Sequence, residues 1–452
     1  MSGAGTSELL AIGDRLVADA RGGEQVEVVV VHSAETEVKV YEQEIESLSS
    51  AEARGVGVRV VVDGRQGFAY AGSFEPDDLR QALADARDNA SFGTPDEFNG
   101  LAEPDGVAEA DLDVFDERLA AFGTDRKVDL ALELEKLTLG ADSRIAGLEA
   151  AEYVDALDTV AIVSTTGIRN ASQETSCYVM ASALAVEGDE TQTGFGFSLA
   201  RAPEDVDVAK AAKEASEKAT RMLGATKPAS ERVTIVLDPW VTAQFLGLIG
   251  WTLNGESVLK GRSLFADRLG DEVAAAGITL VDDPTDPAAF TATSVDGEGL
   301  ATRRNALIEG GVLRKFVHNA YTARRAGTVS TGSAVRGGYK STPGVGVMAV
   351  SLVPGTRTQA ELVASVGDGI LVQEVSGLHS GVNPVSGDFS TGAEGLRISG
   401  GALGAPLREF TIGSTLQRML LDVVEVGGDL EWQPMNAAGV SLVIRDVTVS
   451  GT

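Results

Sequence analysis

Cysteine and histidine are scarce in this chain of 452 residues, which has one cysteine and three histidines. A single thiol, Cys177, excludes an intramolecular disulfide and predicts a reducing, cytoplasmic location. It lies in an apolar, strand-like run, which predicts a buried structural thiol rather than a nucleophile. His32, His318 and His379 are separated by 286 and 61 residues, so no two of them have the short spacing of a metal site.

Long apolar runs are also missing. No stretch has the uninterrupted length that spans a bilayer, and the first 20 residues lack the basic region of a signal peptide. Hydrophobic residues make up 43% of the chain and charged residues 23%, as in globular proteins. A chain this long exceeds one hydrophobic core, so we expect two domains.

Basic residues are outnumbered, and the formal net charge is −30. Residues 1–226 hold 44 acidic and 19 basic residues, whereas residues 227–452 hold 23 and 18. Phosphate backbones repel such a chain, which argues against direct nucleic-acid binding. The nearly neutral C-terminal half is the better candidate for a protein interface.

The N-terminal half alternates between helical and strand periodicity. Helices are predicted at 7–21, 76–91, 125–139 and 204–223, and strands at 25–32, 36–48, 54–62, 66–71, 151–165, 168–186 and 192–201. Residues 92–120 are acidic and rich in turn residues, which is typical of an extended surface segment. This half therefore predicts an α/β sandwich-like domain with an antiparallel sheet, residues 1–224.

The C-terminal half is richer in glycine and poorer in charge beyond the linker 225–230. Short valine-rich strands are predicted at 232–237, 278–281, 345–353, 370–375 and 440–449, and helices at 239–251 and 416–424. We expect a strand-rich domain with few helices, residues 231–452. The whole chain is thus predicted to be α+β, with two domains.

Residues 377–395 form the most unusual segment, because small residues, a histidine, an Asn-Pro and a Gly-Asp occur there without helical or strand period. Such a segment buries little apolar surface, so its order must come from backbone hydrogen bonds or from a ligand. It is either a long surface turn or a shaped binding loop.

Several segments of the C-terminal half resemble the TldD/PmbA family of two-subunit cytoplasmic peptidases. The matching residues are those of 321–325, 330–336, the strand 370–372 and the loop 379–395, with 160–168 fitting in outline. One branch of this family carries zinc on a helix with a His-Glu-x-x-x-His pattern, completed by a late cysteine. Zinc bound in this way activates water for attack on a peptide carbonyl.

The residues of the zinc motif are absent here. Matching the end of the family motif to 253–256 places Leu246, Gly247 and Trp251 where His, Glu and His would stand, and 431–439 contains no cysteine. None of these three side chains ligates zinc. The resemblance therefore implies the metal-free TldE (PmbA) branch, with no metal or other cofactor in this chain and with zinc in a TldD-like partner subunit.

The resemblance also implies a role. The chain would be a non-catalytic subunit of a heterodimeric zinc metallopeptidase, inactive alone, that acts on unfolded or modified peptides such as antibiotic precursors. The family's older description as a modulator of DNA gyrase implies an indirect effect. The alternative is a homodimeric peptide-binding or scaffolding protein without peptidase activity.

Candidate residues for binding substrate or partner lie in two places. His379, Ser380, Asn383 and Ser386 occupy the small-residue segment, and Arg324 and Arg336 belong to a basic cluster whose guanidinium groups suit carboxylates. Structural roles remain open in both places: a long surface turn with a solvent-facing or turn-capping His379, and surface ion pairs with the acidic N-terminal domain for the two arginines. No catalytic residue is assigned.

Other chemistries fit less well. Ser380, Ser386, His379 and Asp388 lie too close in sequence for a usual catalytic triad and lack a Gly-x-Ser-x-Gly elbow. An enzyme built around His379 without zinc remains a third hypothesis. The acidic pairs Asp282-Asp283 and Asp296/Glu298 could bind a cation, but the run 281–287 is more simply an Asp/Pro turn and no EF-hand spacing is present.

Overall fold

The computed structural model describes residues 5–451, which divide into two compact units. Unit 1 comprises residues 5–220 together with Thr293–Thr302 and Asn319–Gly344. Unit 2 comprises Arg221–Ala292, Arg303–His318 and 345–451. Two segments from the C-terminal half of the sequence are therefore built into unit 1.

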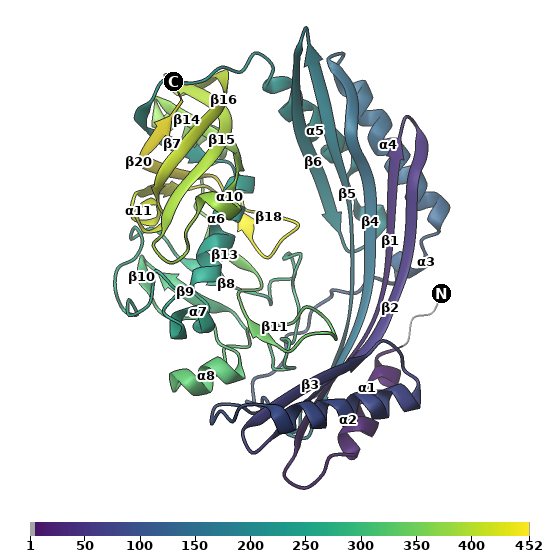
Figure 1. Ribbon diagram of the computed structural model, residues 1–452. Coiled ribbons are helices and arrows are strands. Elements are labelled where there is room, and N and C mark those ends of the chain that lie inside the picture. The colour runs from purple at the N-terminus through teal and green to yellow at the C-terminus, as the bar shows by residue number, and fades with distance from the viewer. Residues whose placement is uncertain (1–4, 452) are drawn as a thin grey trace. The chain divides into compact units, whose positions relative to one another are not determined.

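Unit 1 is organised around one long antiparallel sheet with the strand order β3-β2-β1-β4-β5-β6 (Figure 1). Its strands are β1 (Gln25–Tyr41), β2 (Glu44–Val62), β3 (Arg65–Ala71), β4 (Ile145–Ser164), β5 (Arg169–Glu187), β6 (Glu190–Ala200) and the short β11 (Ala334–Val335). Its helices are α1 (Thr6–Ala18), α2 (Pro76–Phe92), α3 (Glu117–Ala121), α4 (Thr124–Ala141), η1 (Pro203–Asp205), α5 (Val208–Arg221) and α8 (Ala320–Ala326).

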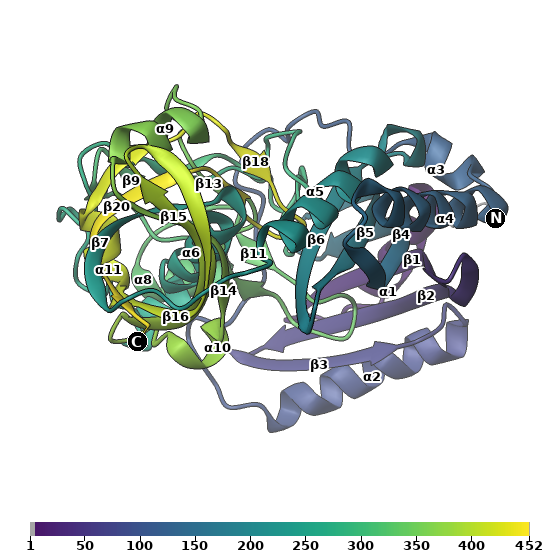
Figure 2. The same ribbon diagram turned by 90° about the horizontal axis from the view of Figure 1, so that it is seen from above.

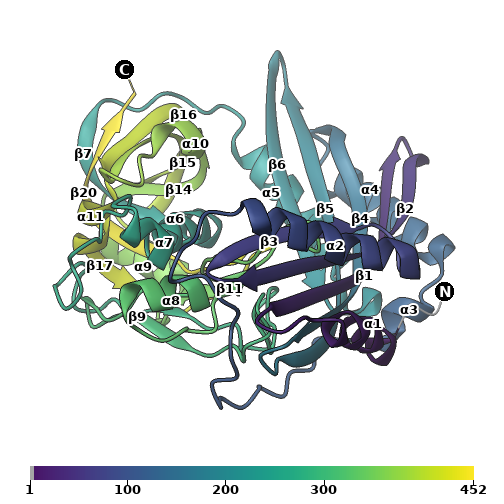
Figure 3. The ribbon, with the colours of Figure 1, turned by 60° about the horizontal axis from the view of Figure 1, so that its bottom comes forward.

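Alternation along β1 directs its valines to the two faces of the sheet. Val26, Val28 and Val30 pack with residues of α1 and α2, and α2 lies along β3 (Figure 3). Val29, on the opposite face, packs with Leu300 of the segment 293–302. Helices therefore cover one face of the sheet, and a segment from the C-terminal half covers part of the other.

Unit 2 contains a ring of strands in the order β16-β15-β14-β7-β20, which closes because β16 also pairs with β20. Its strands are β7 (Glu231–Leu237), β8 (Leu280–Asp282), β9 (Asn305–Glu309), β10 (Val312–Leu313), β13 (Val350–Leu352), β14 (Gly369–Ser376), β15 (Asp388–Ser399), β16 (Ala402–Thr415), β17 (Val423–Val426), β18 (Glu431–Trp432), β19 (Ala438–Gly439) and β20 (Leu442–Ser450). Its helices are α6 (Pro239–Thr252), α7 (Gly255–Leu259), α9 (Gln359–Val366), α10 (Leu378–Gly381) and α11 (Leu416–Leu421), and the two-residue strand β12 (Gly344–Val345) lies at the unit boundary.

Helix α6 is surrounded by the strands of this ring (Figure 2). Its sequence is apolar on nearly every side, which is typical of a helix buried in a core rather than lying on a surface. Phe245 of α6 meets Phe389 of β15 edge to face, with 6.4 Å between ring centroids. The core of unit 2 therefore lies between this helix and the closed ring.

The predicted α+β class is confirmed, but several boundaries are wrong. The predicted strand 36–48 is interrupted by a turn at Glu42 and Gln43, both with positive φ, which are not the Asn-Gly or Asp-Gly residues that usually mark this turn. The predicted helix 416–424 ends at Leu421, and 388–395 is strand rather than loop. Among the described residues, every helix is too short or too polar to cross a bilayer.

Candidate functional site

The segment 377–387 of unit 2, which we call the 377–387 loop, begins with the single turn α10 and ends where β15 starts. Asn383 organises its centre: the side-chain oxygen accepts hydrogen bonds from the backbone N–H of Val385 (2.9 Å) and Ser386 (3.2 Å). The Asn383 carbonyl accepts one from Gly387 (2.7 Å). This is the local side chain-to-backbone bonding that asparagine provides in turns, so the loop is ordered by its own backbone.

Two predicted residues of this loop point polar groups to solvent. His379 and Ser380 are exposed, and the Ser380 hydroxyl donates to the Gly377 carbonyl at 3.2 Å. Ser386 donates to Asp388 at 2.7 Å. No hydrogen bond between side chains of residues 5–451 joins His379 to Ser380, Ser386 or Asp388, so the loop contains no assembled triad.

The other two predicted residues, Arg324 and Arg336, lie in unit 1 and already have partners. Arg324 donates to the carbonyls of Phe98 (2.8 Å), Gly100 (2.7 Å) and Leu101 (3.1 Å). Burial is the main cause that lowers the pKa of Arg324. This arginine fastens the segment 319–344 to the extended chain that follows α2; its predicted binding role stays a prediction.

Arg336 belongs to a buried ionic network with Glu27, Arg59 and Glu298. Arg59 lies 2.6 Å from one oxygen of Glu27 and 3.4 Å from Glu298, and Arg336 lies 2.5 Å from the other oxygen of Glu27. All four side chains are at most 5% exposed. Burial by itself would raise the pKa of Glu27, but the two arginines outweigh it and hold that pKa below its usual range.

Asp296 is connected to this ionic network through a hydrogen bond from the backbone N–H of Glu298. Its carboxylate accepts hydrogen bonds from the N–H groups of Glu298 (2.9 Å), Leu300 (3.0 Å) and Ala334 (3.0 Å). Burial raises the pKa of Asp296 to about 7, and the neighbouring Glu298 adds to this, although the three backbone donors oppose it. The pair Asp296/Glu298 thus shapes a turn and holds two segments together.

Helix α6 carries the three residues that the resemblance matches to the zinc motif. Leu246 is fully buried in the core, Gly247 is half-buried and Trp251 is 49% exposed. In residues 5–451, no three His, Cys, Asp or Glu side chains lie close enough together to hold a metal ion. Asp282, also in unit 2, accepts from the N–H groups of Met348 and Ala349 with one oxygen, and burial raises its pKa to about 6.

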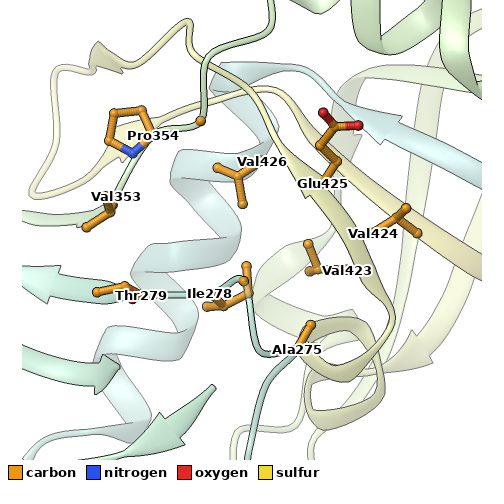
Figure 4. A pocket seen from close by; sticks show the side chains of 11 residues that line it. Ala275, Ile278, Thr279, Val353, Pro354, Val423, Val424, Glu425 and Val426 are labelled. Carbon is orange, nitrogen blue, oxygen red and sulfur yellow. The ribbon is translucent and has the colours of Figure 1, made fainter. Parts of the chain in front are cut away.

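Unit 2 also has an apolar depression of about 330 Å³ (Figure 4). Ile278, Val353 and Val424 line it, and Val353 and Val424 are 44% and 59% exposed. Its acidic residue, Glu425, is already paired with Arg357 at 2.9 Å. The depression therefore offers apolar contact and no free group for acid–base chemistry.

Sequence reasoning missed the buried ionic network because its members lie up to 309 residues apart. One feature of the sequence could have indicated it. Glu27 lies between Val26 and Val28 in a valine-rich strand, where a buried apolar residue would be expected. A carboxylate there requires a buried cation, although the sequence does not say which one.

Three domain models of the PmbA/TldA metallopeptidases match the chain: domain 1 at residues 26–90, the central domain at 117–223 and the C-terminal domain at 230–451. Metalloprotease PmbA of Escherichia coli O157:H7 is 24% identical over 430 residues, which cover 94% of this chain and 92% of that protein. The PmbA homologue of Haemophilus influenzae is 24% identical over 437 residues, covering 95% and 93%.

Solved structures share the fold. TldE from Thermococcus kodakarensis superposes with a TM-score of 0.89 at 24% identity, covering 99% of this chain and 100% of that one. A Thermotoga maritima protein, described as a proposed modulator of DNA gyrase, gives 0.90 at 24% identity, covering 97% and 99%. The matched domains span most of the sequence from residue 26 to residue 451, and the chain belongs to the PmbA/TldD metallopeptidase family.

Proposed function

We propose that this chain is the non-catalytic, TldE-type subunit of a heterodimeric metallopeptidase whose zinc is held by a TldD-like partner. The observation that carries the proposal is the composition of α6. The helix has leucine, glycine and tryptophan at the positions of the zinc motif, and Leu246 is buried in the core. Neither an aliphatic side chain nor an indole replaces imidazole or carboxylate as a zinc ligand.

The chain would contribute binding surface to the complex and no catalytic residue. The exposed His379 and Ser380 of the 377–387 loop carry hydrogen-bonding groups that a peptide or a partner could use, and hydrogen bonds to Asn383 within the loop hold its shape. A preformed loop binds at a lower entropic cost than a disordered one. Unfolded or modified peptides, such as antibiotic precursors, are the proposed substrates of the complex, and the cytoplasm is its proposed location.

Reconstitution tests the proposal. The purified chain is mixed with a relative that carries His-Glu-x-x-x-His and the late cysteine, and mass, metal content and cleavage of an unfolded peptide are measured. We expect a one-to-one complex that cleaves the peptide and is inhibited by a chelator, while this chain alone binds no stoichiometric zinc and cleaves nothing. A transition metal bound stoichiometrically by this chain's own side chains would overturn the assignment.

His379→Ala separates the remaining hypotheses. If the chain alone cleaves peptide, resists chelators and loses this activity on substitution, it is an enzyme with its own site. If the chain binds peptide but forms no complex with the zinc-bearing relative, it is instead a scaffolding protein.

A further inference from the structure

Strand β2 has a long free edge in unit 1. β3 pairs with β2 only over Val56–Val62, and no other strand of residues 5–451 pairs with the outer edge of 44–55. The first eleven residues of β2 are all exposed. Figure 1 shows β2 beside β1, as the outer strand of the hairpin they form. The backbone groups along this edge are therefore available to another strand.

The usual protection of such an edge is incomplete here. Natural edges are commonly blocked by charged side chains, especially lysine, or by proline. Residues 44–55 contain no lysine or proline, and their charged residues are Glu44, Glu46, Glu52 and Arg54. Ile45 and Leu48 are 51% and 44% exposed on the same stretch. The other uncharged residues are serine, alanine and glycine, whose small side chains leave room for a second strand. Such an edge suits addition of a strand through main-chain hydrogen bonds.

The charges along the edge indicate which strand fits. Two copies of an edge pair antiparallel about a two-fold axis perpendicular to the sheet, so opposing residues lie on the same face and are an even number of positions apart. Near the middle of the free edge, Leu48, Ser49, Ser50 or Ala51 can lie on the axis. Like charges directly opposite each other destabilise a strand pair, and opposite charges stabilise it.

Only one of these four registers pairs opposite charges without opposing two acids. With Ala51 on the axis, Arg54 faces Leu48 and Glu52 faces Ser50, so no opposite charges meet. With Leu48 on the axis Glu44 faces Glu52 of the other copy, and with Ser49 on the axis Glu46 faces Glu52. With Ser50 on the axis, Glu46 faces Arg54 twice. The remaining pairs are then Ser47 with Ala53, Ser49 with Ala51, Leu48 with Glu52 and Ile45 with Gly55.

We propose that the free edge of β2 is a self-association surface, on which a second copy of this chain pairs antiparallel with Ser50 opposite Ser50. The two sheets then continue across the two-fold axis, and the edge is covered in both copies. The interface requires no zinc-bearing subunit and is thus independent of the proposed peptidase role. Because its two Glu46–Arg54 pairs are solvent-exposed, we expect it to weaken as salt is added.

Disulfide trapping in the full chain tests the register. Ser50→Cys places two thiols directly opposite each other, where Cα atoms are about 4.5–5.5 Å apart, within the range of a disulfide. The native thiol, Cys177, is fully buried and does not compete. Ser47→Cys is the matched control, because its thiols would lie six residues apart along the strands, about 20 Å. We expect a covalent dimer on oxidation of Ser50→Cys and none from Ser47→Cys.

Charge reversal then tests the specificity in the Ser50→Cys background. Arg54→Glu or Glu46→Arg alone opposes like charges and should reduce the dimer yield about tenfold, whereas the double variant should restore it. Circular dichroism checks that each variant is folded. Equal trapping of Ser47→Cys, absence of trapping at Ser50, or failure of the double variant to recover would each overturn the proposal. Covalent dimers that form only with a zinc-bearing relative would overturn it as well.

Discussion

At the scale of single residues, Arg59 shows how one side chain can hold distant parts of a chain together. Its guanidinium contacts Glu27 of β1 and Glu298 of the segment 293–302, and all three are almost completely buried. Such a network is tolerated only while its charges are balanced, because an isolated ion in a core loses its hydration without compensation.

Removing this cation should destabilise the chain strongly. We expect Arg59→Met to lower the free energy of unfolding by about 3–5 kcal/mol, since it leaves Glu298 without its cation and Glu27 with only Arg336. Urea denaturation measures the change. The control is Arg80→Met, whose partner Asp77 is exposed, and it should cost less than about 1 kcal/mol. Equal losses in the two variants would contradict a special role for the network.

Asp282 predicts a pH dependence of stability. Its pKa in the folded chain is about 6, above the ordinary value of 3.8, because burial disfavours the ionised form. The folded state therefore retains this proton between pH 3.8 and about 6, and the stability it provides is lost as the pH rises through that window.

The variant Asp282→Asn isolates this effect, because its side chain stays neutral. Relative to the unmodified chain, we expect it to gain about 2 kcal/mol of unfolding free energy between pH 4 and pH 7. Chemical denaturation of both proteins at each pH gives the difference, in which the contributions of other groups cancel. A difference that does not change with pH would show that Asp282 is ionised throughout.

At the scale of elements, the periodicity of apolar residues predicted helices better than the residue types predicted turns. The helix 76–91 was placed within one residue because its apolar positions recur with helical period and a proline stands at its start. The turn at Glu42 and Gln43 was missed because tertiary pairing of β1 with β2 imposes positive φ on residues that seldom adopt it alone. The hairpin of β15 and β16 was missed because its glycines and serines hide the strand period.

The 377–387 loop depends on one glycine at its end. Gly387 has a φ of +86°, and a Cβ there would clash with the side-chain oxygen of Gln417. We expect Gly387→Ala to cost roughly 1–2 kcal/mol from the backbone conformation alone and to speed amide exchange within 377–387. Gly404→Ala, in β16, has room and no positive φ and is the control. Unchanged exchange in the loop would show that its conformation does not depend on this residue.

At the scale of the whole molecule, the units do not follow the linear order of the chain. Unit 1 includes residues 293–302 and 319–344. Leu300 and Ala320, one from each segment, pack in one apolar cluster with Val29 and Ile162 of the sheet. A domain cut from the sequence at residue 224 would expose this face.

The fragment 1–224 should therefore fold poorly by itself. It lacks Glu298, Arg336, Leu300 and Ala320, so both the ionic network and an apolar patch of the sheet are incomplete. We expect little cooperative unfolding in a thermal scan and protease sensitivity in β1 and β4. Co-expression with residues 225–452 should restore protection. A fragment that unfolds cooperatively alone would show that the inserted segments are dispensable.

The α+β class, most of the long helices and strands, and the absence of histidine and cysteine from the positions matched to the zinc motif could be predicted from the amino-acid sequence alone, because they follow from local periodicity and from counting. Three other features became visible in the folded chain: the pairing of each carboxylate with its arginine, the closure of the ring by β16 and β20, and the extension of β2 beyond β3. These features depend on pairing between residues tens to hundreds of positions apart. Local secondary-structure propensity does not predict such pairing.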